Sequence, residues 1–215
     1  MPLIYLLRHA ESEANLKGIL AGRDNSVNLT SNGFKDARKV SKVLSKIDFE
    51  AIYSSPINRC QQTIEPLLRH LTDKPVHLTD ALIEMDYGSW SGKSLKQLSS
   101  KKEWSLIQKQ PAEFTFPKGE SFLSMRKRVK DLLTSLANSQ GPILLVSHGD
   151  VIKMALTLAL DLPLNKFQNF AVAPASITII NYSRDSKSVV SLNNSLGSKS
   201  LFKRSSSFIL GGGRG

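Results

Sequence analysis

The stretch LIYLLRHAESEAN (residues 3–15) changes from apolar to polar within one step along the chain. Leu3 to Leu7 are apolar enough for a strand that is covered on both faces, as parallel strands in α/β proteins are. Arg8 and His9 follow at once, and His9 is one of only four histidines in 215 residues. Ligands bind beyond the carboxyl ends of strands in open α/β sheets, so these two side chains are predicted to face a site. A structural histidine is the alternative from this stretch alone.

Apolar runs rich in β-branched residues recur along the chain and alternate with helical patterns, which favours an α/β class. Strands are predicted at residues 3–7, 51–54, 76–78, 143–147 and 176–182, with an edge strand near 189–192. Helices are predicted from Thr30 or Ser31, after Pro56, over residues 121–137, and over residues 150–160. Residues 1–183 are expected to form one domain, in which the polar segment 91–119 covers the site. Residues 184–215 are expected to add the edge strand and a basic, Ser/Gly-rich, flexible tail.

The net charge of +11 is unevenly placed, because six basic residues and one acid lie from Arg184 onward, which leaves +5 there and +6 on residues 1–183. A basic surface attracts nucleic acid, membranes or anionic metabolites, or is simply solvated. The single cysteine, Cys60, excludes an internal disulfide. The apolar run 151–162 is short and contains Lys153, so no membrane span is expected and a cytoplasmic location is predicted.

The stretch ILLVSHGD (residues 143–150) repeats the order of the first: an apolar strand, His148, a glycine and a predicted helix. Gly149 lets the backbone approach a ligand closely, and the amides at a helix start bind anions. Two of the four histidines therefore follow strands. The other two have ordinary explanations, since His70 is predicted to end an exposed helix and His77 lies in a short strand.

A cation is predicted at the start of a helix in YSSPINRCQQT (residues 53–63). Ser55 as N-cap and Pro56 at the first helical position place Arg59 in or near the first turn. A cation there costs about 0.3–1 kcal/mol unless an anion shares the site. Arg59 is therefore interpreted as an anion ligand, with a solvent-facing arginine as the alternative.

Two acids follow an apolar pair in ALIEMDYGSWSG (residues 81–92). Glu84 and Asp86 lie close to Trp90, and a partly desolvated carboxyl group near an aromatic ring can have a raised pKa suited to general acid catalysis. A solvated loop acid is the alternative for this segment alone. Together, the four stretches supply two histidines, two arginines and a carboxylate. Arginines neutralise phosphoryl oxygens, a neutral imidazole attacks phosphorus, and a carboxylic acid protonates the departing oxygen.

The stretches LLRHAESEAN, SSPINRCQQT, EMDYGSWSG and VSHGD, in this order, resemble the signature of the histidine phosphatase superfamily, in its phosphoglycerate-mutase-like branch. The resemblance extends from Leu3 to about Tyr182, and four ordered motifs make it specific. It implies a three-layer α/β/α sandwich with a mixed, mostly parallel sheet. It also implies a phosphomonoesterase that acts on a small phosphorylated metabolite without a metal or another cofactor. A membrane or nucleic-acid partner is not expected, and a homodimer stays open.

The resemblance also implies roles for individual residues. His9 resembles the nucleophile that becomes phosphohistidine. Glu84, four residues before Gly88, resembles the proton donor that later activates water. The remaining residues are expected to hold the phosphoryl group: Arg8, Asn15, Arg59, His148 and Gly149. In FPKGES, Lys118, Glu120 and Ser121 lie where relatives cover the pocket, and they are predicted to contact the leaving group.

The chain departs from the family pattern at two positions. Ala10 stands where the motif has glycine, and Ser91 stands where many relatives have glutamate. Within the family, phosphoglycerate mutases resemble this chain but usually have a longer insertion between the glutamate and second histidine motifs. Only 63 residues (85–147) separate Glu84 from His148 here. The short cover favours a phosphatase, which must admit water, and a mutase is the alternative.

Other functional classes fit the sequence less well. A cysteine phosphatase needs an arginine six residues after its nucleophile, but Pro66 stands there after Cys60. A binuclear metallophosphoesterase needs more Asp and His ligands. A nucleic-acid-binding module would lack both a zinc-finger pattern and the aromatic signature of an RNA-recognition motif. A catalytically silent scaffold is disfavoured because all five expected active-site positions are filled.

Overall fold

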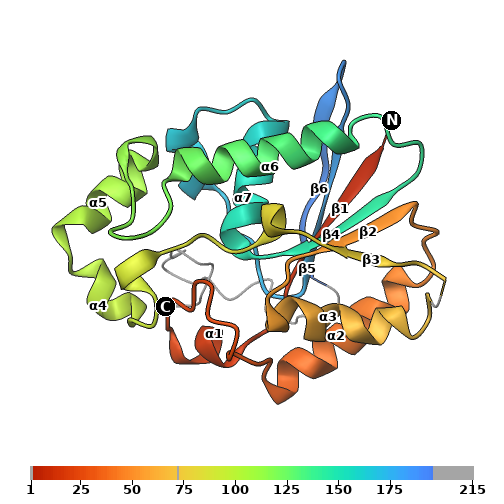
Figure 1. Ribbon diagram of the computed structural model, residues 1–215, viewed down its shortest axis with the longest axis horizontal. Helices are drawn as coiled ribbons and strands as arrows, with labels where there is room; N and C mark the ends of the chain where they lie inside the picture. Colours follow the sequence, from red (N-terminus) through yellow and green to blue (C-terminus); the bar gives the residue numbers. More distant parts are fainter. Residues whose placement is uncertain (1, 72, 196–215) are drawn as a thin grey trace.

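The computed structural model describes residues 2–71 and 73–195, and Figure 1 shows a sheet between two groups of helices. The strands run in the order β3-β2-β4-β1-β5-β6. Their bounds are β1 (Leu3–Arg8), β2 (Ala51–Ser54), β3 (Val76–Leu78), β4 (Ile143–Ser147), β5 (Ser176–Tyr182) and β6 (Lys187–Ser195). Strands β1 to β4 are parallel to one another, whereas β5 is antiparallel to β1 and β6 is antiparallel to β5. The predicted mixed, mostly parallel sheet is confirmed.

Helices cover both faces of the sheet, as Figure 1 shows with α6 and α7 on one side and α2 and α3 on the other. Their bounds are α2 (Ser31–Leu44), α3 (Asn58–Leu68), α6 (Phe122–Leu136) and α7 (Gly149–Ala159). Side chains of β4 alternate between the two cores. Ile143 and Leu145 pack in the core with α6 and α7, and Leu144 and Val146 pack in the core with α2 and α3. A strand buried on both faces explains why its sequence is a continuous apolar run.

The register of the central strands brings the two histidine motifs together. Arg8 at the end of β1 pairs with Ser147 at the end of β4. The backbone amide of His9 then donates to the carbonyl of Ser147 at 2.9 Å. Because parallel strands end at the same edge of a sheet, His9 and His148 leave the sheet side by side.

The predicted helices are present, with small changes at their ends. Thr30 caps α2, because its hydroxyl accepts from the amide of Gly33 at 2.9 Å. The helix after Pro56 begins at Asn58, with Ile57 as its N-cap, and not at Pro56. The Ser55 hydroxyl accepts from the amide of Ile57 at 3.3 Å and so lies before the helix.

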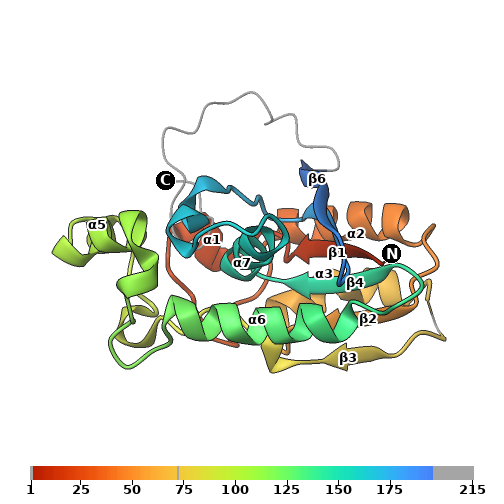
Figure 2. The same cartoon turned by 90° about the horizontal axis from the view of Figure 1, so that it is seen from above.

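Three α-helices, one six-residue 3₁₀ segment and three shorter 3₁₀ segments were not predicted. The longer ones are α1 (Glu13–Lys17), α4 (Leu95–Ser99), α5 (Lys102–Lys109) and the 3₁₀ segment η4 (Leu164–Asn169). Segment 91–119, called the cap below, contains α4, α5 and the 3₁₀ segment η3 (Pro111–Glu113). Figure 2 shows α5 beyond the end of the sheet toward which β1 points.

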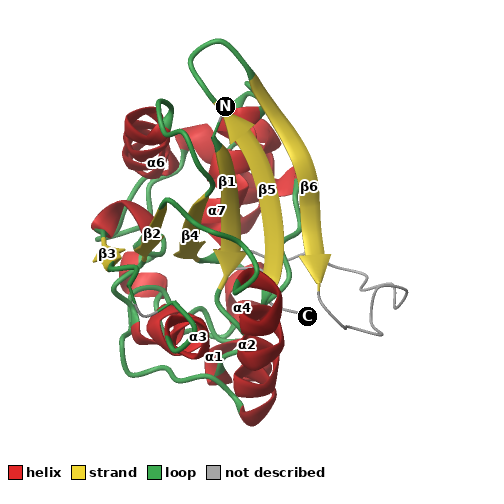
Figure 3. Ribbon diagram, turned by 90° about the vertical axis from the view of Figure 1, so that its right-hand side faces the viewer, coloured by secondary structure: helices red, strands yellow, loops and turns green. Residues whose placement is uncertain are grey.

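The strand predicted near 189–192 is longer than expected, since β6 spans nine residues and lies at the edge of the sheet beside β5 (Figure 3). The predicted flexible tail beyond residue 195 lies outside the described residues. No helix within the described residues is long and apolar enough to cross a membrane.

Candidate active site

His9 lies at the end of β1 with only 2% of its surface exposed. Its Nδ1 is 2.8 Å from the carbonyl oxygen of Ala10, which can only accept, so Nδ1 holds the proton. The Nε2 lone pair is then left to accept from the Arg59 Nε at 3.3 Å. Burial lowers the pKa of His9 well below 6.5, and Arg59 and Arg8 lower it further. The ring is therefore neutral, and Nε2 is its nucleophilic nitrogen.

His148 lies directly before α7, and its ring centroid is 5.2 Å from that of His9. Its Nε2 is 2.8 Å from the Ser55 hydroxyl, and its buried Nδ1 has no hydrogen-bond partner among the described residues. Burial, followed by the charge of Arg59, lowers the pKa of His148 well below 6.5. A neutral ring whose Nε2 accepts from Ser55 presents Nδ1–H as a donor, which suits an anionic oxygen.

Arg59 is buried at the N-terminal end of α3, as its position in the first turn predicts. Its two terminal nitrogens donate to the carbonyl oxygens of Gly22 at 2.7 Å and Asp24 at 3.2 Å. These neutral acceptors orient the guanidinium without cancelling its charge. The alternative of a solvent-facing arginine is therefore wrong, and the positive charge lies beside His9.

Arg8 is fully buried behind His9, and its Nη1 donates to the carbonyl of Val172 at 2.6 Å. Burial lowers the pKa of Arg8 to about 10, and the charges of Glu84 and Asp150 oppose that shift. Arg8 therefore stays protonated at neutral pH and adds a second positive charge to the site.

Glu84 is 4% exposed, so the alternative of a solvated loop acid is wrong for this residue. Its Oε1 accepts from the amide of Met85 at 3.0 Å. The pKa of Glu84 is raised to about 7, chiefly by burial and also by the charge of Asp150, while Arg59 and Arg8 oppose the rise. A carboxyl group with this pKa is partly protonated near neutral pH and can both give and take a proton.

Tyr87 and Asp150 form a buried pair next to Glu84 that the sequence interpretation did not include. The Tyr87 hydroxyl donates to Asp150 Oδ2 at 2.8 Å, and Lys153 Nζ lies 3.3 Å from Asp150 Oδ1. The position of Asp150 directly after the His-Gly motif was the available signal. The pairing of Asp150 with Tyr87 could not be read from the sequence, because the two residues are 63 positions apart.

One pocket brings the predicted acid, nucleophile and cation together. The residues that line it are His9, Ser12, Ala14, Asn15, Ile19, Leu20, Ala21, Gly22, Arg59, Glu84, Tyr87 and Leu95. Asn15 also lines the pocket, and its Oδ1 accepts from the amide of Ser12 at 3.1 Å. Its contact with a phosphate stays a prediction. Gly149 is buried as the first residue of α7 and is not in the lining. Of the cap residues, only Leu95 lines the pocket.

The three residues predicted to contact the leaving group have other surroundings in the structure. Ser121 caps α6, because its hydroxyl accepts from the amide of Ser124 at 3.0 Å. Lys118 is exposed on a tight turn with φ of 59°. Glu120 binds Arg23 and Arg128. None of the three lines the pocket, and their contact with a substrate stays a prediction.

The two departures from the family pattern have local explanations. Ala10 is fully buried in the core with α2 and α3, where its methyl group packs, and its amide donates to the Thr63 hydroxyl at 2.9 Å. Ser91 lies against Gly22, since a Cβ added to that glycine would come within 2.7 Å of the Ser91 hydroxyl. A small side chain at position 91 therefore leaves room for Gly22, whose carbonyl oxygen helps to orient Arg59.

A family model for the histidine phosphatase superfamily (branch 1) matches residues 4–195. The chain belongs to this family. Phosphoserine phosphatase 1 of Hydrogenobacter thermophilus is 29% identical over 197 residues, which cover 90% of this chain and 92% of the relative. A 2,3-bisphosphoglycerate-dependent phosphoglycerate mutase of Thermoplasma acidophilum is 28% identical over 181 residues, which cover 84% of this chain and 88% of the relative.

A solved structure of a histidine phosphatase has the same fold. A mutant phosphoserine phosphatase from Entamoeba histolytica, in complex with phosphoserine, matches with a TM-score of 0.80 at 27% identity. The match covers 91% of this chain and 98% of that chain. The predicted three-layer fold is confirmed, and the protein is a phosphomonoester hydrolase of this superfamily.

Proposed function

We propose that this histidine phosphatase hydrolyses its substrate through a phosphohistidine on His9, with Glu84 as general acid and then general base. The observation that supports this most is the state of the two groups in one buried pocket. His9 is neutral with Nε2 as the nucleophile, and Glu84 has a pKa of about 7. An attacking imidazole and a protonated acid are therefore available together below neutral pH.

In the first step, His9 Nε2 attacks phosphorus and the bond between phosphorus and the ester oxygen breaks. Glu84 gives its proton to the departing oxygen, so that the alcohol leaves neutral. The bond from Nδ1–H to the Ala10 carbonyl stabilises the positive charge that forms on the phosphorylated ring. Arg8, Arg59 and the Nδ1 of His148 are proposed to bind the phosphoryl oxygens and to stabilise the negative charge on them in the transition state.

In the second step, ionised Glu84 takes a proton from water, and the water oxygen attacks phosphorus. The bond between phosphorus and Nε2 breaks, so His9 is neutral again and inorganic phosphate leaves. Glu84 ends the cycle protonated, ready for the next substrate. One carboxyl group thus serves both steps, which a pKa near the working pH permits.

The substrate is proposed to be a small phosphorylated metabolite, hydrolysed rather than isomerised. Phosphoserine is the first compound to test, because the relative from Hydrogenobacter thermophilus and the solved structure from Entamoeba histolytica are both named phosphoserine phosphatases. Asn15 is proposed as a further phosphate contact because it lines the pocket with His9. The cytoplasmic location and a homodimer stay predictions.

The decisive experiment measures phosphate release from p-nitrophenyl phosphate and a panel of metabolite phosphates that includes phosphoserine. The wild-type protein is expected to hydrolyse p-nitrophenyl phosphate and at least one metabolite phosphate, and to form an acid-labile, alkali-stable phosphoenzyme. His9→Ala is expected to abolish both. His70→Ala, at an exposed position after α3, is the matched control and should leave both unchanged. Unchanged turnover in His9→Ala would contradict the mechanism. Interconversion of 2- and 3-phosphoglycerate faster than phosphate release would favour the mutase alternative.

A further inference from the structure

The backbone around Glu84 is held by arginine side chains from distant parts of the chain. No helix or strand covers residues 83–87. The carbonyl oxygen of Glu84 accepts from Arg23 Nε at 3.0 Å. The carbonyl oxygen of Ala81 accepts from Arg128 Nη1 at 2.8 Å. The position of the acid therefore depends on where these two guanidinium groups are held.

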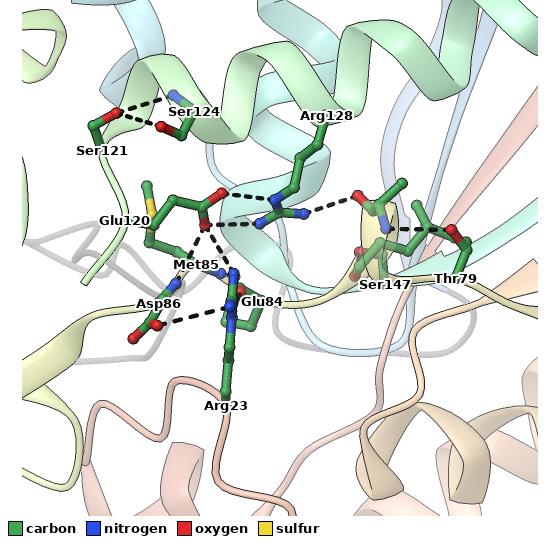
Figure 4. Close-up of polar contacts among 12 residues, drawn as sticks. Arg23, Thr79, Glu84, Met85, Asp86, Glu120, Ser121, Ser124, Arg128 and Ser147 are labelled. Carbon is green, nitrogen blue, oxygen red and sulfur yellow. Dashed lines mark hydrogen bonds and ion pairs between the residues drawn. The ribbon is translucent and has the colours of Figure 1, made fainter. Parts of the chain in front are cut away.

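Glu120 holds both guanidinium groups with one carboxylate, as Figure 4 shows. Its Oε1 accepts from Arg128 Nε at 2.8 Å. Its Oε2 accepts from Arg128 Nη2 at 3.1 Å, from Arg23 Nη2 at 3.2 Å and from the amide of Asp86 at 3.4 Å. The side chains of Glu120 and Arg128 are 10% and 18% exposed, so solvent screens their charge-assisted pair little, whereas the Arg23 side chain is 36% exposed.

The backbone of Glu120 is itself fixed against the same segment. Its amide donates to the carbonyl of Asp86 at 2.8 Å, and its carbonyl accepts from the amide of Phe116 at 3.2 Å. The two backbones approach so closely that a Cβ on Gly119 would lie 2.4 Å from the Asp86 oxygen. Glu120 therefore has no freedom to follow a ligand, and its carboxylate is a fixed point for the arginines.

We propose that Glu120 is a positioning residue for the general acid, because it holds Arg23 and Arg128 on the carbonyl oxygens of the segment that contains Glu84. This inference rests on the proposed role of Glu84. Without the Glu120 charge, the neighbouring guanidinium groups of Arg23 and Arg128 repel each other and lose their common acceptor, and Arg23 keeps only its longer ion pair with Asp86 at 3.7 Å. The carboxyl group of Glu84 then moves relative to the departing oxygen, and small displacements of a catalytic group are costly in rate.

The test uses Glu120→Gln, which keeps the size of the side chain and removes its charge. An alkyl phosphate needs a proton on its leaving oxygen, whereas 2,4-dinitrophenyl phosphate scarcely does. We expect kcat/KM for the alkyl phosphate to fall by about 10-fold or more and that for the dinitrophenyl ester to change by less than about 3-fold. Competitive inhibition by inorganic phosphate should be unchanged, because His9, His148 and Arg59 keep their partners.

Two further variants separate positioning from general loss of structure. Asp131→Asn removes a carboxylate from an exposed ion pair with Lys127 on the same helix, α6. It is the matched control and should leave both substrates unaffected. Arg128→Lys keeps the charge but loses the forked contact with Glu120 and the bond to Ala81. It should reproduce the selective loss on the alkyl phosphate, and it serves as the test if Glu120→Gln does not fold.

Three outcomes would overturn the inference. Equal slowing of both substrates in well-folded variants would mean that neither residue positions the acid. Unchanged kcat/KM for both substrates in both variants would also mean that neither residue positions the acid. A raised KM limited to particular leaving groups, with kcat preserved, would show that Glu120 contacts the substrate directly. Failure of the proposed function is distinguishable from all three, because it would appear as turnover in the wild type that His9→Ala does not abolish.

Discussion

The Nε atom of Arg59 lies 3.3 Å from Nε2 of His9, so one guanidinium donates to the nitrogen that is proposed to attack phosphorus. Burial, together with the charge of Arg59, lowers the pKa of His9 and keeps the ring neutral, and the contact with Arg59 occupies the lone pair on Nε2. A phosphoryl group is a stronger acceptor for arginine than a neutral imidazole. Substrate binding is therefore expected to draw Arg59 onto the phosphoryl oxygens and to release the nucleophile.

The first prediction concerns the pH dependence of kcat/KM. Activity should fall as pH rises through about 7, because Glu84 then loses the proton that the leaving oxygen needs. The fall on the acid side should come well below pH 6.5, where His9 becomes protonated. Glu84→Gln should lose the alkaline limb, and its kcat/KM for an alkyl phosphate should fall by about 10²–10⁴. An alkaline limb that persists near pH 7 in the variant would assign it to the substrate instead.

The second prediction tests the influence of Asp150 on the acid. The negative charge of Asp150 raises the pKa of Glu84, so Asp150→Asn should move the alkaline limb of kcat/KM to lower pH. The same change leaves Lys153 buried without its partner carboxylate, at a cost of about 3–5 kcal/mol. The pH profile of Asp150→Asn should therefore be measured well below the melting temperature of this variant.

A double variant separates these two effects of Asp150. The double variant Asp150→Asn with Lys153→Met removes both charges of the buried pair. It should recover much of the stability that Asp150→Asn alone loses, while the alkaline limb of kcat/KM stays at the lower pH. Asp36→Asn, in an exposed pair with Lys39 on α2, is the control and should leave the limb in place. An alkaline limb that is the same in all three proteins would contradict the assignment.

The third prediction concerns metals. Within the described residues, no group of three or more His, Cys, Asp and Glu side chains could hold a metal ion. The proposed chemistry uses arginines for the charge that a metal supplies elsewhere. Dialysis against excess EDTA should leave kcat unchanged, with metal content followed by mass spectrometry. A loss of activity that added metal restores would contradict the mechanism.

The fourth prediction concerns Gly88, the glycine four residues after the acid. Its φ is +51°, and an added Cβ would lie 2.2 Å from the carbonyl oxygen of Pro117. Gly88→Ala should lower stability by roughly 2–4 kcal/mol, as strain and a backbone clash combine, and should slow alkyl phosphates more than activated esters. Gly18→Ala is the control, because its φ is +62° and nothing lies within 4 Å of the added Cβ. Equal effects of the two changes on melting temperature would exclude the clash.

Local patterns predicted the strands and the long helices, because their signals lie within a few residues. Thr30 and Ser121 are N-caps in the structure, as a hydroxyl before an apolar periodic run indicates. The start of α3 was misplaced because it depends on a distant contact. The amide of Asn58 donates to Asn25 at 2.7 Å, which no local signal shows.

The sequence motifs singled out His9, the two arginines and Glu84, but not the groups that change the pKa of Glu84 or hold its backbone. Asp150 is held by Tyr87 from 63 residues away, and Glu120 binds Arg23 from 97 residues away. Such partners become neighbours only when distant segments of the chain fold together. The cap helices were missed for a similar reason, since short helices are stabilised mainly by tertiary packing.

The fifth prediction is that the burial of Glu84, which raises its pKa, lowers the stability of the protein above about pH 7. Its pKa is about 7 in the folded protein, against 4.5 for a solvated glutamate. The favourable contribution of a raised carboxyl pKa is fully present below pH 4.5 and is lost as pH rises through about 7, because ionised Glu84 is buried. Each pKa unit corresponds to about 1.4 kcal/mol, so the full effect is roughly 2–4 kcal/mol.

Glu84→Gln removes the charge and keeps an oxygen for the Met85 amide. Its free energy of unfolding relative to the wild type should therefore rise between pH 4.5 and pH 8, with the variant the more stable protein at pH 8. Urea denaturation at several pH values measures this difference. Glu65→Gln, at an exposed position in a pair with Arg69, provides the control and should show a much smaller change. If the difference between wild type and Glu84→Gln did not depend on pH, the carboxyl group would have an ordinary pKa and could not serve as the acid near neutral pH.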